Sequence, residues 1–456
     1  MVFLSTLLAL LQNPTLHYLD TPLPGPGPTG VFSPMAIQPG SDICFGTVTS
    51  ANGTQSPALQ MIRGGAGNLP LLPGHTLGQV TALGYNPNEQ FPAGISSDTS
   101  GHSRGVFWAL NSSGTWVPND IGDLGGGNVQ ILGSDQEGDW LCGWADVFSS
   151  NGQAIPRPFV YNIIQSVIID LNPGYQSESK SFDCDIDSNG KVTAVGHIYS
   201  YLQHPSAAIF EPGQAPSLLG GTGGLSSTAY AIDEDHIVGE SSTQAGGVFH
   251  AISWQAPNYL AVDLGTLGGS ESRATSVSGL MVYGQAQIPS GEWRACYWDL
   301  SLPTAPFAQE LSSLPAISTA QLSNVRAPNG TTMLLADGKN AQGNFGFVLE
   351  EFQLEVPPSM SPGTSYSLQA SPILSGEVVY FGGALSLGST VVPPVPGLLS
   401  DLHQPRLLGV GVGSSPSSEV NITVVAPPLG SGTPLYFQAL TIQRGQVSTL
   451  GRASIL

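Results

Sequence analysis

A run of alternating carboxylates is the sharpest chemical pattern in this sequence. Asp183, Asp185 and Asp187 are each separated by one residue, and Asn189-Gly190 follows. Hard carboxylate oxygens on a bending loop suit Ca²⁺, so the pattern predicts a calcium site, with Ca²⁺ as the only cofactor suggested. The glycine spacing and distal glutamate of an EF-hand are missing. Asp and Asn are also favoured in hairpin turns, and this competing interpretation carries more weight.

Aromatic residues supply the second set of candidates. All seven tryptophans precede residue 300. Three of them end short apolar strands, which predicts that they belong to the core: Trp108, Trp254 and Trp298. Three others fall nearer to loops or strand ends, where an indole can stack on a sugar or on a partner's side chain: Trp116, Trp144 and Trp293. Packing inside the protein is the competing interpretation for these three, and it carries more weight.

Motifs for catalysis give little support to an enzyme. The S-x-D-x-G-x-x-W boxes and the arginine cluster of a sialidase are both missing. Glycoside hydrolysis needs two carboxylates, but these can come from distant parts of a chain, where sequence spacing does not reveal them. His250 and Arg294 occupy repeated strand positions, which favours a structural role over a role in ligand binding. We therefore predict no catalytic residues.

Internal repeats are the strongest signal of the fold. A hydrophobic residue followed by glycine recurs every 43 to 53 residues. In the same phase, a short apolar strand follows each copy, and Gly-rich turns such as LGTLGG (264–269) separate the units. The motif copies are Phe45-Gly46, Ala93-Gly94, Cys142-Gly143, Val195-Gly196, Val238-Gly239 and Tyr283-Gly284, and we assign Leu335-Ala336 as a seventh copy in which alanine replaces glycine.

Each unit of about 48 residues contains four short strands with turn residues between them. A single four-stranded sheet cannot bury both of its faces, whereas a ring of such sheets can. The fold class is therefore predicted to be all-β, with a seven-bladed β-propeller at residues 14–350. The segment Tyr18–Leu23 resembles Val262–Leu267, so we expect residues 15–24 to form the outer strand of the last blade and close the ring.

Two units resemble a known family. The stretches VDLGTLGG (262–269) with MVYGQ (281–285), and HIVGES (236–241) with HAISW (250–254), are similar to the bacterial HAF-type extracellular repeat. That family carries D-L-G-T-L-G-G, V-V-G-x-S and H-A-F-x-W motifs. The resemblance covers residues 30–350 and is most specific in units five and six. It implies a secreted or surface-associated propeller and no particular reaction.

The repeat ends near residue 350. Residues 351–456 contain no tryptophan, and Pro- and Gly-rich turns separate short apolar strands such as Leu407–Val412 and Leu435–Leu440. This pattern predicts a C-terminal β-sandwich of about 100 residues. Such a module can support the propeller, anchor it to the cell envelope or mediate assembly.

Charge and composition exclude some partners. The net charge is −20, with only 12 Lys and Arg, and these are scattered singly. Nucleic acids and anionic membranes need clustered cations, so neither is expected as a partner. Residues 351–456 hold five of the 32 acidic residues, which places nearly all of the negative charge in residues 1–350.

The first residues and the cysteines bear on location. Residues 1–13 contain an apolar run that we interpret as a degraded or truncated signal segment, because it lacks a basic start and a cleavage site. No stretch has transmembrane length.

The four cysteines form no C-x-x-C pair and are expected to be mostly free, buried thiols: Cys44, Cys142, Cys184 and Cys296.

Three hypotheses of function follow. The first is a secreted or cell-surface binding protein that recognises a protein or a glycan through propeller loops, without catalysis. The second is a polysaccharide hydrolase or lyase with carboxylates that converge in the central channel. The third is a structural envelope protein anchored by its C-terminal domain. The ligand, the binding face and the oligomeric state do not follow from the sequence.

Overall fold

The computed structural model describes most of the chain as β-structure. The described residues are 18–23, 30–38, 43–61, 65–86, 89–135, 139–174, 177–199, 204–244, 247–301, 308–311, 321–326, 334–340, 343–351, 353–371, 378–391, 399–402, 406–412, 420–441, 446–447 and 451–456. The expected signal segment at residues 1–13 lies outside them. In the described part, no helix has the length and apolar composition that crossing a bilayer requires.

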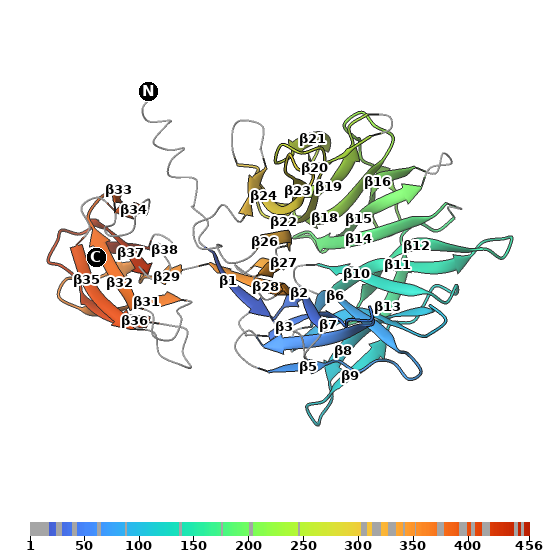
Figure 1. The fold of residues 1–456 in the computed structure, drawn as a ribbon, viewed down its shortest axis with the longest axis horizontal. Helices are drawn as coiled ribbons and strands as arrows, with labels where there is room; N and C mark the ends of the chain where they lie inside the picture. The colour runs from blue at the N-terminus through green and yellow to red at the C-terminus, as the bar shows by residue number, and fades with distance from the viewer. Residues whose placement is uncertain are drawn as a thin grey trace. The chain divides into compact units, whose positions relative to one another are not determined.

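Seven sheets of four strands each dominate the described chain. Each of the first six is a meander of four consecutive antiparallel strands, as the sequence repeats predict (Figure 1). Sheet 1 contains β2 (Val31–Ile37), β3 (Ile43–Thr49), β4 (Gln55–Met61) and β5 (Ala66–Asn68). Sheet 2 contains β6 (Leu77–Asn86), β7 (Glu89–Ser97), β8 (Ser103–Leu110) and β9 (Trp116–Asp120). Sheet 3 contains β10 (Val129–Ser134), β11 (Trp140–Phe148), β12 (Ala154–Asn162) and β13 (Val167–Asp170).

The remaining sheets continue the series. Sheet 4 contains β14 (Ser179–Ile186), β15 (Val192–Tyr199), β16 (Pro205–Phe210) and β17 (Ser217–Leu218). Sheet 5 contains β18 (Ser227–Asp233), β19 (His236–Ser242), β20 (Phe249–Gln255) and β21 (Leu260–Gly265). Sheet 6 contains β22 (Ser272–Ser278), β23 (Met281–Gln287), β24 (Trp293–Asp299) and β25 (Gln309–Glu310). Sheet 7 contains β26 (Gln321–Arg326), β27 (Leu334–Asn340), β28 (Gly343–Glu351) and, paired with β28, the N-terminal strand β1 (Tyr18–Leu23).

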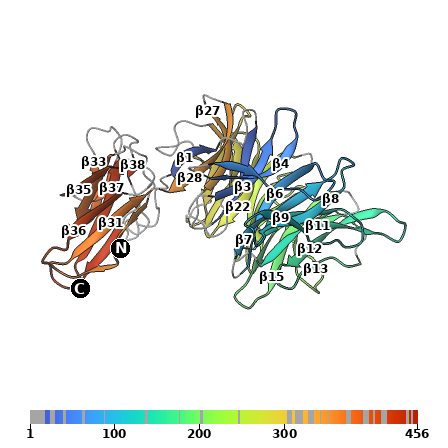
Figure 2. The same cartoon turned by 90° about the horizontal axis from the view of Figure 1, so that it is seen from below.

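Neighbouring sheets contact one another in chain order. The first strands β2, β6, β10, β14, β18, β22 and β26 touch in succession, and β27 of sheet 7 contacts β2 of sheet 1. At this last seam Asp337 accepts a hydrogen bond from the Ser33 hydroxyl at 2.6 Å and pairs with Arg326 at 2.9 Å. Figure 2 shows the same sheets from below. The contacts therefore lead from sheet 1 through sheet 7 and back to sheet 1.

The repeated glycine has a steric cause. A β-bulge interrupts the first strand of every one of the seven sheets, and the glycine of the second strand lies opposite the residue before the bulge. At Gly143 a Cβ atom would lie 1.9 Å from the carbonyl oxygen of Gln130, and at Gly196 it would lie 1.9 Å from that of Lys180. Any side chain at these positions would collide with the backbone of the first strand.

The seventh copy of this motif was misassigned from the sequence. In sheet 7 the bulge falls between Leu322 and Asn324, and Leu322 pairs with Gly338. Asp337-Gly338 therefore occupies the position that we assigned to Leu335-Ala336. The sequence search required a hydrophobic residue before the glycine. It therefore missed Gly338, which follows the charged Asp337, whereas the other six glycines follow apolar residues.

Large apolar side chains fill the space between the sheets. Trp108, Trp254 and Trp298 are all 0 % exposed, which confirms their predicted place in the core. Trp108 Nε1 donates to the carbonyl of Pro70 at 2.6 Å, and Trp254 Nε1 donates to that of Gly220 at 2.7 Å. Each indole thereby bonds the backbone just beyond the fourth strand of the preceding sheet and links two neighbouring sheets.

The chain divides into two compact units, the first of which is Thr21–Ser312 with Thr319–Val348. The second unit consists mainly of Leu349–Leu456. Its strands are β29 (Gln353–Glu355), β30 (Ser359–Met360), β31 (Ser365–Ser371), β32 (Val378–Ala384), β33 (Leu387–Val391), β34 (Leu399–Leu402), β35 (Arg406–Val412), β36 (Val420–Val425), β37 (Pro434–Thr441), β38 (Gln446–Val447) and β39 (Gly451–Ile455).

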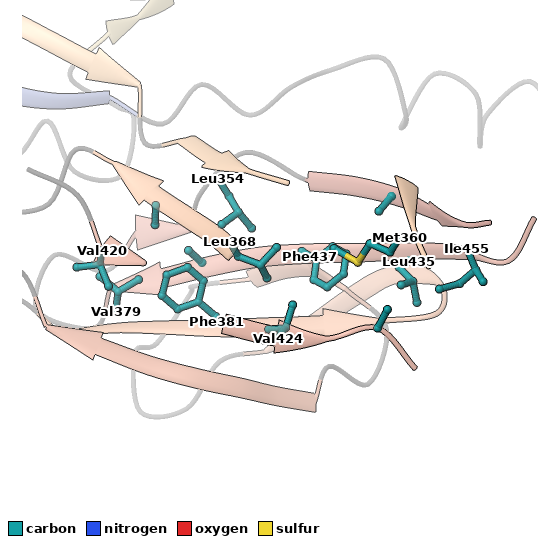
Figure 3. Close-up of a cluster of buried hydrophobic side chains, with 14 residues drawn as sticks. Leu354, Met360, Leu368, Val379, Phe381, Val420, Val424, Leu435, Phe437 and Ile455 are labelled. Carbon is teal, nitrogen blue, oxygen red and sulfur yellow. The ribbon is translucent and has the colours of Figure 1, made fainter. Parts of the chain in front are cut away.

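Two sheets of this second unit share one apolar core. The three-stranded sheet β29-β31-β36 contributes Leu368 and Val420, and the six-stranded sheet β30-β39-β37-β32-β35, with β38 beside β37, contributes Phe381 and Phe437. Figure 3 shows these side chains converging from both sheets. Alternate residues of each strand enter this core, as the period of two in a strand requires.

Candidate binding site

The residues that directly follow the repeated glycines occupy seven equivalent positions, and at least three of them contact the next sheet. These seven positions, which we call the post-glycine row, are Thr47, Ile95, Trp144, His197, Glu240, Gln285 and Lys339. Thr47 Oγ1 accepts from the backbone N–H of Val80 at 3.3 Å, and the Trp144 ring lies 5.0 Å below Lys180 Nζ. The row therefore places varied chemical groups at equivalent positions along the seams between sheets.

The seam between sheets 5 and 6 contains a linked set of polar contacts. Glu240 accepts from Arg273 Nε at 2.7 Å and from the Tyr230 hydroxyl at 2.6 Å. Arg273 also lies 5.6 Å from the Tyr230 ring centroid. Burial raises the pKa of Tyr230, so its hydroxyl keeps its proton and remains a donor. A second carboxylate, Glu271, acts on Arg273 electrostatically.

His197 differs from the other members of the row. Its side chain is 8 % exposed, and within the described part of the protein neither ring nitrogen has a hydrogen-bond partner. The ring packs edge-on against Phe182 at 5.3 Å and Tyr199 at 5.1 Å between centroids. Burial, aided by the charge of Lys180, lowers the pKa of His197 to about 4. The imidazole is therefore neutral at pH 7.

A groove opens beside the row where sheets 6 and 7 meet the start of β2. Its volume is about 440 Å³, within the range of small-ligand sites. Trp293 and Phe345 supply aromatic surface, and Lys339 is the member of the row that reaches it. The complete lining is Val31, Glu292, Trp293, Arg294, Leu322, Ser323, Asp337, Gly338, Lys339, Asn344 and Phe345.

Charge in this groove is balanced. Arg294 Nη1 donates to Glu292 at 2.5 Å, and Lys339 Nζ lies 4.0 Å from the same carboxylate. The Asp337 carboxylate pairs with Arg326 and accepts the hydrogen bond from the Ser33 hydroxyl, as described above. The Lys339 side chain is 57 % exposed, so its ammonium group can meet a ligand. The groove thus offers aromatic surface together with donors and acceptors in a locally neutral setting.

The three predicted tryptophans lie in three different sheets. Trp293 begins β24 and lines the groove. Trp144 belongs to the post-glycine row in sheet 3, under Lys180. Trp116 begins β9 and packs edge-on against Phe45 at 5.7 Å. Among the described residues, Trp293 lines a groove, whereas Trp144 contacts Lys180 and Trp116 contacts Phe45.

The three predicted calcium ligands hold backbone groups. Asp183 Oδ2 accepts from the N–H of Ile232 at 3.1 Å, and Asp185 Oδ2 accepts from that of Glu234 at 2.8 Å. Both contacts cross from sheet 4 to sheet 5. Burial raises the pKa of Asp183 well above its usual range and also raises that of Asp185.

Asp187 serves the hairpin turn. Its Oδ1 accepts from the N–H groups of Asn189 and Lys191 at 2.9 Å, and the bond from Lys191 chiefly lowers the pKa of Asp187. Among the described residues, no group of three or more His, Cys, Asp or Glu side chains is arranged to hold a metal ion. The calcium site stays a prediction from the sequence.

Basic side chains on the third strands pair with acidic side chains on the fourth strands. His250 Nδ1 lies 2.8 Å from Asp263, and Arg157 Nη1 lies 2.9 Å from Asp170. Arg294 lies 3.4 Å from Glu310 in the same arrangement. This confirms that His250 and Arg294 have structural partners, and it explains why histidine and arginine replace each other at this repeated position.

The second sheet contains a serine within a G-x-S-x-G spacing. Residues Gly101–Gly105 match the G-x-S-x-G spacing of a hydrolase nucleophile, which the sequence interpretation overlooked. Ser103 begins β8 and is only 3 % exposed, and no helix follows it. A nucleophile elbow needs a serine exposed on a strand-to-helix turn, so Ser103 does not have that geometry.

Several site residues were missed from the sequence. They are Lys180, His197, Tyr230, Glu240, Arg273, Lys339 and Phe345. The sequence offered a signal for His197 and Glu240, because each directly follows a repeated glycine, whereas Lys339 follows Gly338, which only the structure placed in the repeat. The other residues lie in first or third strands. No sequence motif indicates how these strands align with the neighbouring sheet.

No known protein-family model matches the chain, and no curated protein sequence matches it. The resemblance to the HAF-type repeat therefore stays a prediction that rests on the motifs quoted above.

Proposed function

We propose that this chain is a seven-bladed β-propeller with a C-terminal β-sandwich, and that it is a non-catalytic protein that binds a glycan in the groove beside Trp293. The propeller rests on seven four-stranded sheets whose contacts return from sheet 7 to sheet 1. The membership in the HAF-type repeat family and a secreted or cell-surface location are part of the same proposal.

The groove is the observation that carries the binding function. A half-buried Trp293 ring can stack on the apolar face of a sugar, and Ser323, Asn344 and Lys339 can bond its hydroxyl groups. A groove of about 440 Å³ fits a few sugar residues, whereas a stable protein interface needs about 800 Å² from each partner. We take a glycan as the ligand because the groove has the size of a small-ligand site and is lined by Trp293 and Phe345.

A second candidate function is polysaccharide cleavage. Its support is Arg273, which bonds Glu240 and is also influenced by Glu271. Glycoside hydrolysis uses a pair of carboxylates, and Arg273 brings Glu240 and Glu271 into one group. The Glu240 side chain is only 10 % exposed and is already bonded to Arg273 and Tyr230, so binding without cleavage is the better-supported role.

The test is a glycan array with the full-length protein, followed by calorimetry on each hit. Trp293→Ala should weaken binding at least tenfold, because it removes the stacking surface. Trp116→Ala is the matched control, since Trp116 lies in sheet 2 and packs on Phe45, and it should leave affinity unchanged. Every hit is also incubated with the protein and assayed for new reducing ends.

The outcomes separate the hypotheses. Binding that depends on Trp293 without new reducing ends supports the proposal. New reducing ends that disappear in Glu240→Gln would replace it with the enzyme. If both tryptophan variants lose binding equally, or if neither variant changes it, the groove beside Trp293 is not the binding site.

The third hypothesis concerns residues 351–456. If this part anchors the protein to the cell envelope, a chain that ends at residue 350 should leave the cell surface and keep its glycan affinity. Cell fractionation with an antibody against the propeller measures this. A shortened chain that stays on the surface would show that the propeller itself carries the attachment.

A further inference from the structure

Two buried thiols meet at the seam between sheets 3 and 4. Cys142 lies in β11 and Cys184 in β14, and they are 0 % and 1 % exposed. Each thiol influences the pKa of the other, which places the two side chains near each other. Both side chains belong to one apolar cluster that also contains Val160 and Phe210. Neither thiol has a part in the proposed glycan site.

The backbones around these thiols approach closely. Cys142 pairs with Gly133 across sheet 3. A Cβ atom on Gly133 would lie 2.8 Å from the Cα of Asp183, the residue before Cys184. The Cys184 thiol also lies 3.8 Å from the carbonyl oxygen of Trp140, two residues before Cys142. A disulfide needs its two Cα atoms within about 7 Å, and these contacts show that β10 and β11 approach β14 closely beside both cysteines.

We propose that Cys142 and Cys184 are an oxidation site, and that they form a disulfide between sheets 3 and 4 when the chain folds in the presence of a small disulfide oxidant. Oxidised glutathione is one such oxidant. One cysteine thiolate attacks it, forms a mixed disulfide and releases one glutathione thiolate. The second cysteine thiolate then attacks the cysteine sulfur of that mixed disulfide and displaces the second glutathione. Two electrons pass to the oxidant, and the two thiol protons end on the two glutathiones.

Timing follows from the environment of the thiols. Burial raises the pKa of Cys142, and it raises that of Cys184 well above the usual range, so the folded protein holds few thiolates. The bond therefore forms while the sheets are assembling, and oxidation of the reduced, folded protein is slow. Once formed, the bond closes a long loop in the unfolded chain and should raise the Tm by about 5 °C.

The other two cysteines are internal controls. Cys44 lies in sheet 1 and Cys296 in sheet 6, so sheet 7 separates their positions in the series, and both are 0 % exposed. All four cysteines are free thiols in this structure. Burial is therefore common to all four, while contact between two thiols in adjacent sheets distinguishes Cys142 and Cys184.

The experiment refolds the reduced full-length chain from denaturant with a mixture of oxidised and reduced glutathione. The product is denatured at neutral pH in excess N-ethylmaleimide, which alkylates the free thiols before they can exchange, and is analysed by intact mass and by a peptide map without reductant. We expect alkylation of two cysteines, Cys44 and Cys296, and a linked peptide pair that contains Cys142 and Cys184. The same protein refolded with reductant should take up four alkyl groups.

Variants sharpen the result. Cys44→Ala and Cys296→Ala should keep the linked peptide, and Cys142→Ala and Cys184→Ala should lose it. Four alkylated cysteines in the oxidatively refolded wild-type protein, or a link that involves another pair, would overturn the proposal. The wild-type peptide map decides the question even if an alanine variant fails to fold, and its result is independent of glycan binding.

Discussion

Arg273 Nε donates to Glu240 Oε2 at 2.7 Å and joins the first strand of sheet 6 to the second strand of sheet 5. Glu240 is the post-glycine residue of its sheet, and its carboxylate also accepts from Tyr230. The Glu240 side chain is 10 % exposed and the Arg273 side chain 41 %. A nearly buried carboxylate with two donors is therefore a specific link between neighbouring sheets.

Removal of this carboxylate should destabilise the protein. Glu240→Ala leaves the Tyr230 hydroxyl and the Arg273 guanidinium without their acceptor, and we expect the free energy of unfolding to fall by about 2 kcal/mol. Urea denaturation followed by circular dichroism measures this loss. Glu211→Ala removes the partner of Lys191, whose side chain is 54 % exposed, and should cost under about 0.5 kcal/mol. Equal losses in both variants would contradict a special role for Glu240.

The repeated glycine should tolerate no side chain. In Gly143→Ala the new Cβ would lie 1.9 Å from the Gln130 carbonyl oxygen, so the bulge of β10 must shift, and we expect a loss of about 3 kcal/mol or more. Gly220→Ala is the matched control, because no atom lies within 4 Å of a Cβ built there. Thermal unfolding of the two variants compares the costs. A stable Gly143→Ala protein would refute the steric explanation of the repeat.

Stability should depend on pH through His197. The pKa of His197 falls from 6.5 to about 4 in the folded protein, so its contribution to stability is complete above pH 6.5 and is lost as the pH falls toward 4. This change corresponds to about 3 kcal/mol. In His197→Gln that part of the pH dependence between 6.5 and 4 should vanish, and in His250→Gln it should persist. Urea titrations at several pH values check this, and identical pH profiles for the wild type and His197→Gln would contradict it.

The acidic turn of sheet 4 should be structural. Asp185 accepts the N–H of Glu234, so Asp185→Ala should lower the Tm of the protein, and by the same amount in EDTA as in Ca²⁺. Differential scanning fluorimetry of both proteins in both buffers measures the four values. A wild-type Tm that rises with Ca²⁺, and a rise that Asp185→Ala abolishes, would instead establish the calcium site predicted from the sequence.

The candidate site was only partly predictable. Trp293 was predicted from the sequence, because an indole near a strand end can stack on a sugar. Lys339 and Phe345 did not, because the groove joins sheets 6 and 7 to the start of β2, and each sheet adds residues from a different part of the chain. The seventh glycine motif was misplaced for a related reason: the bulge at Ser323 sets the register that brings Gly338 opposite Leu322.

The sequence by itself determined the repeat, its four-strand units and the buried tryptophans, because these depend on alternation, turn residues and a glycine that steric contact demands in every unit. It also singled out the segment Tyr18–Leu23, which pairs with β28. Only the tertiary structure decided which residues meet across the seams, such as Glu240 with Arg273 or Cys142 with Cys184. The loops between repeats vary in length, so a contact between two sheets has no fixed spacing along the chain.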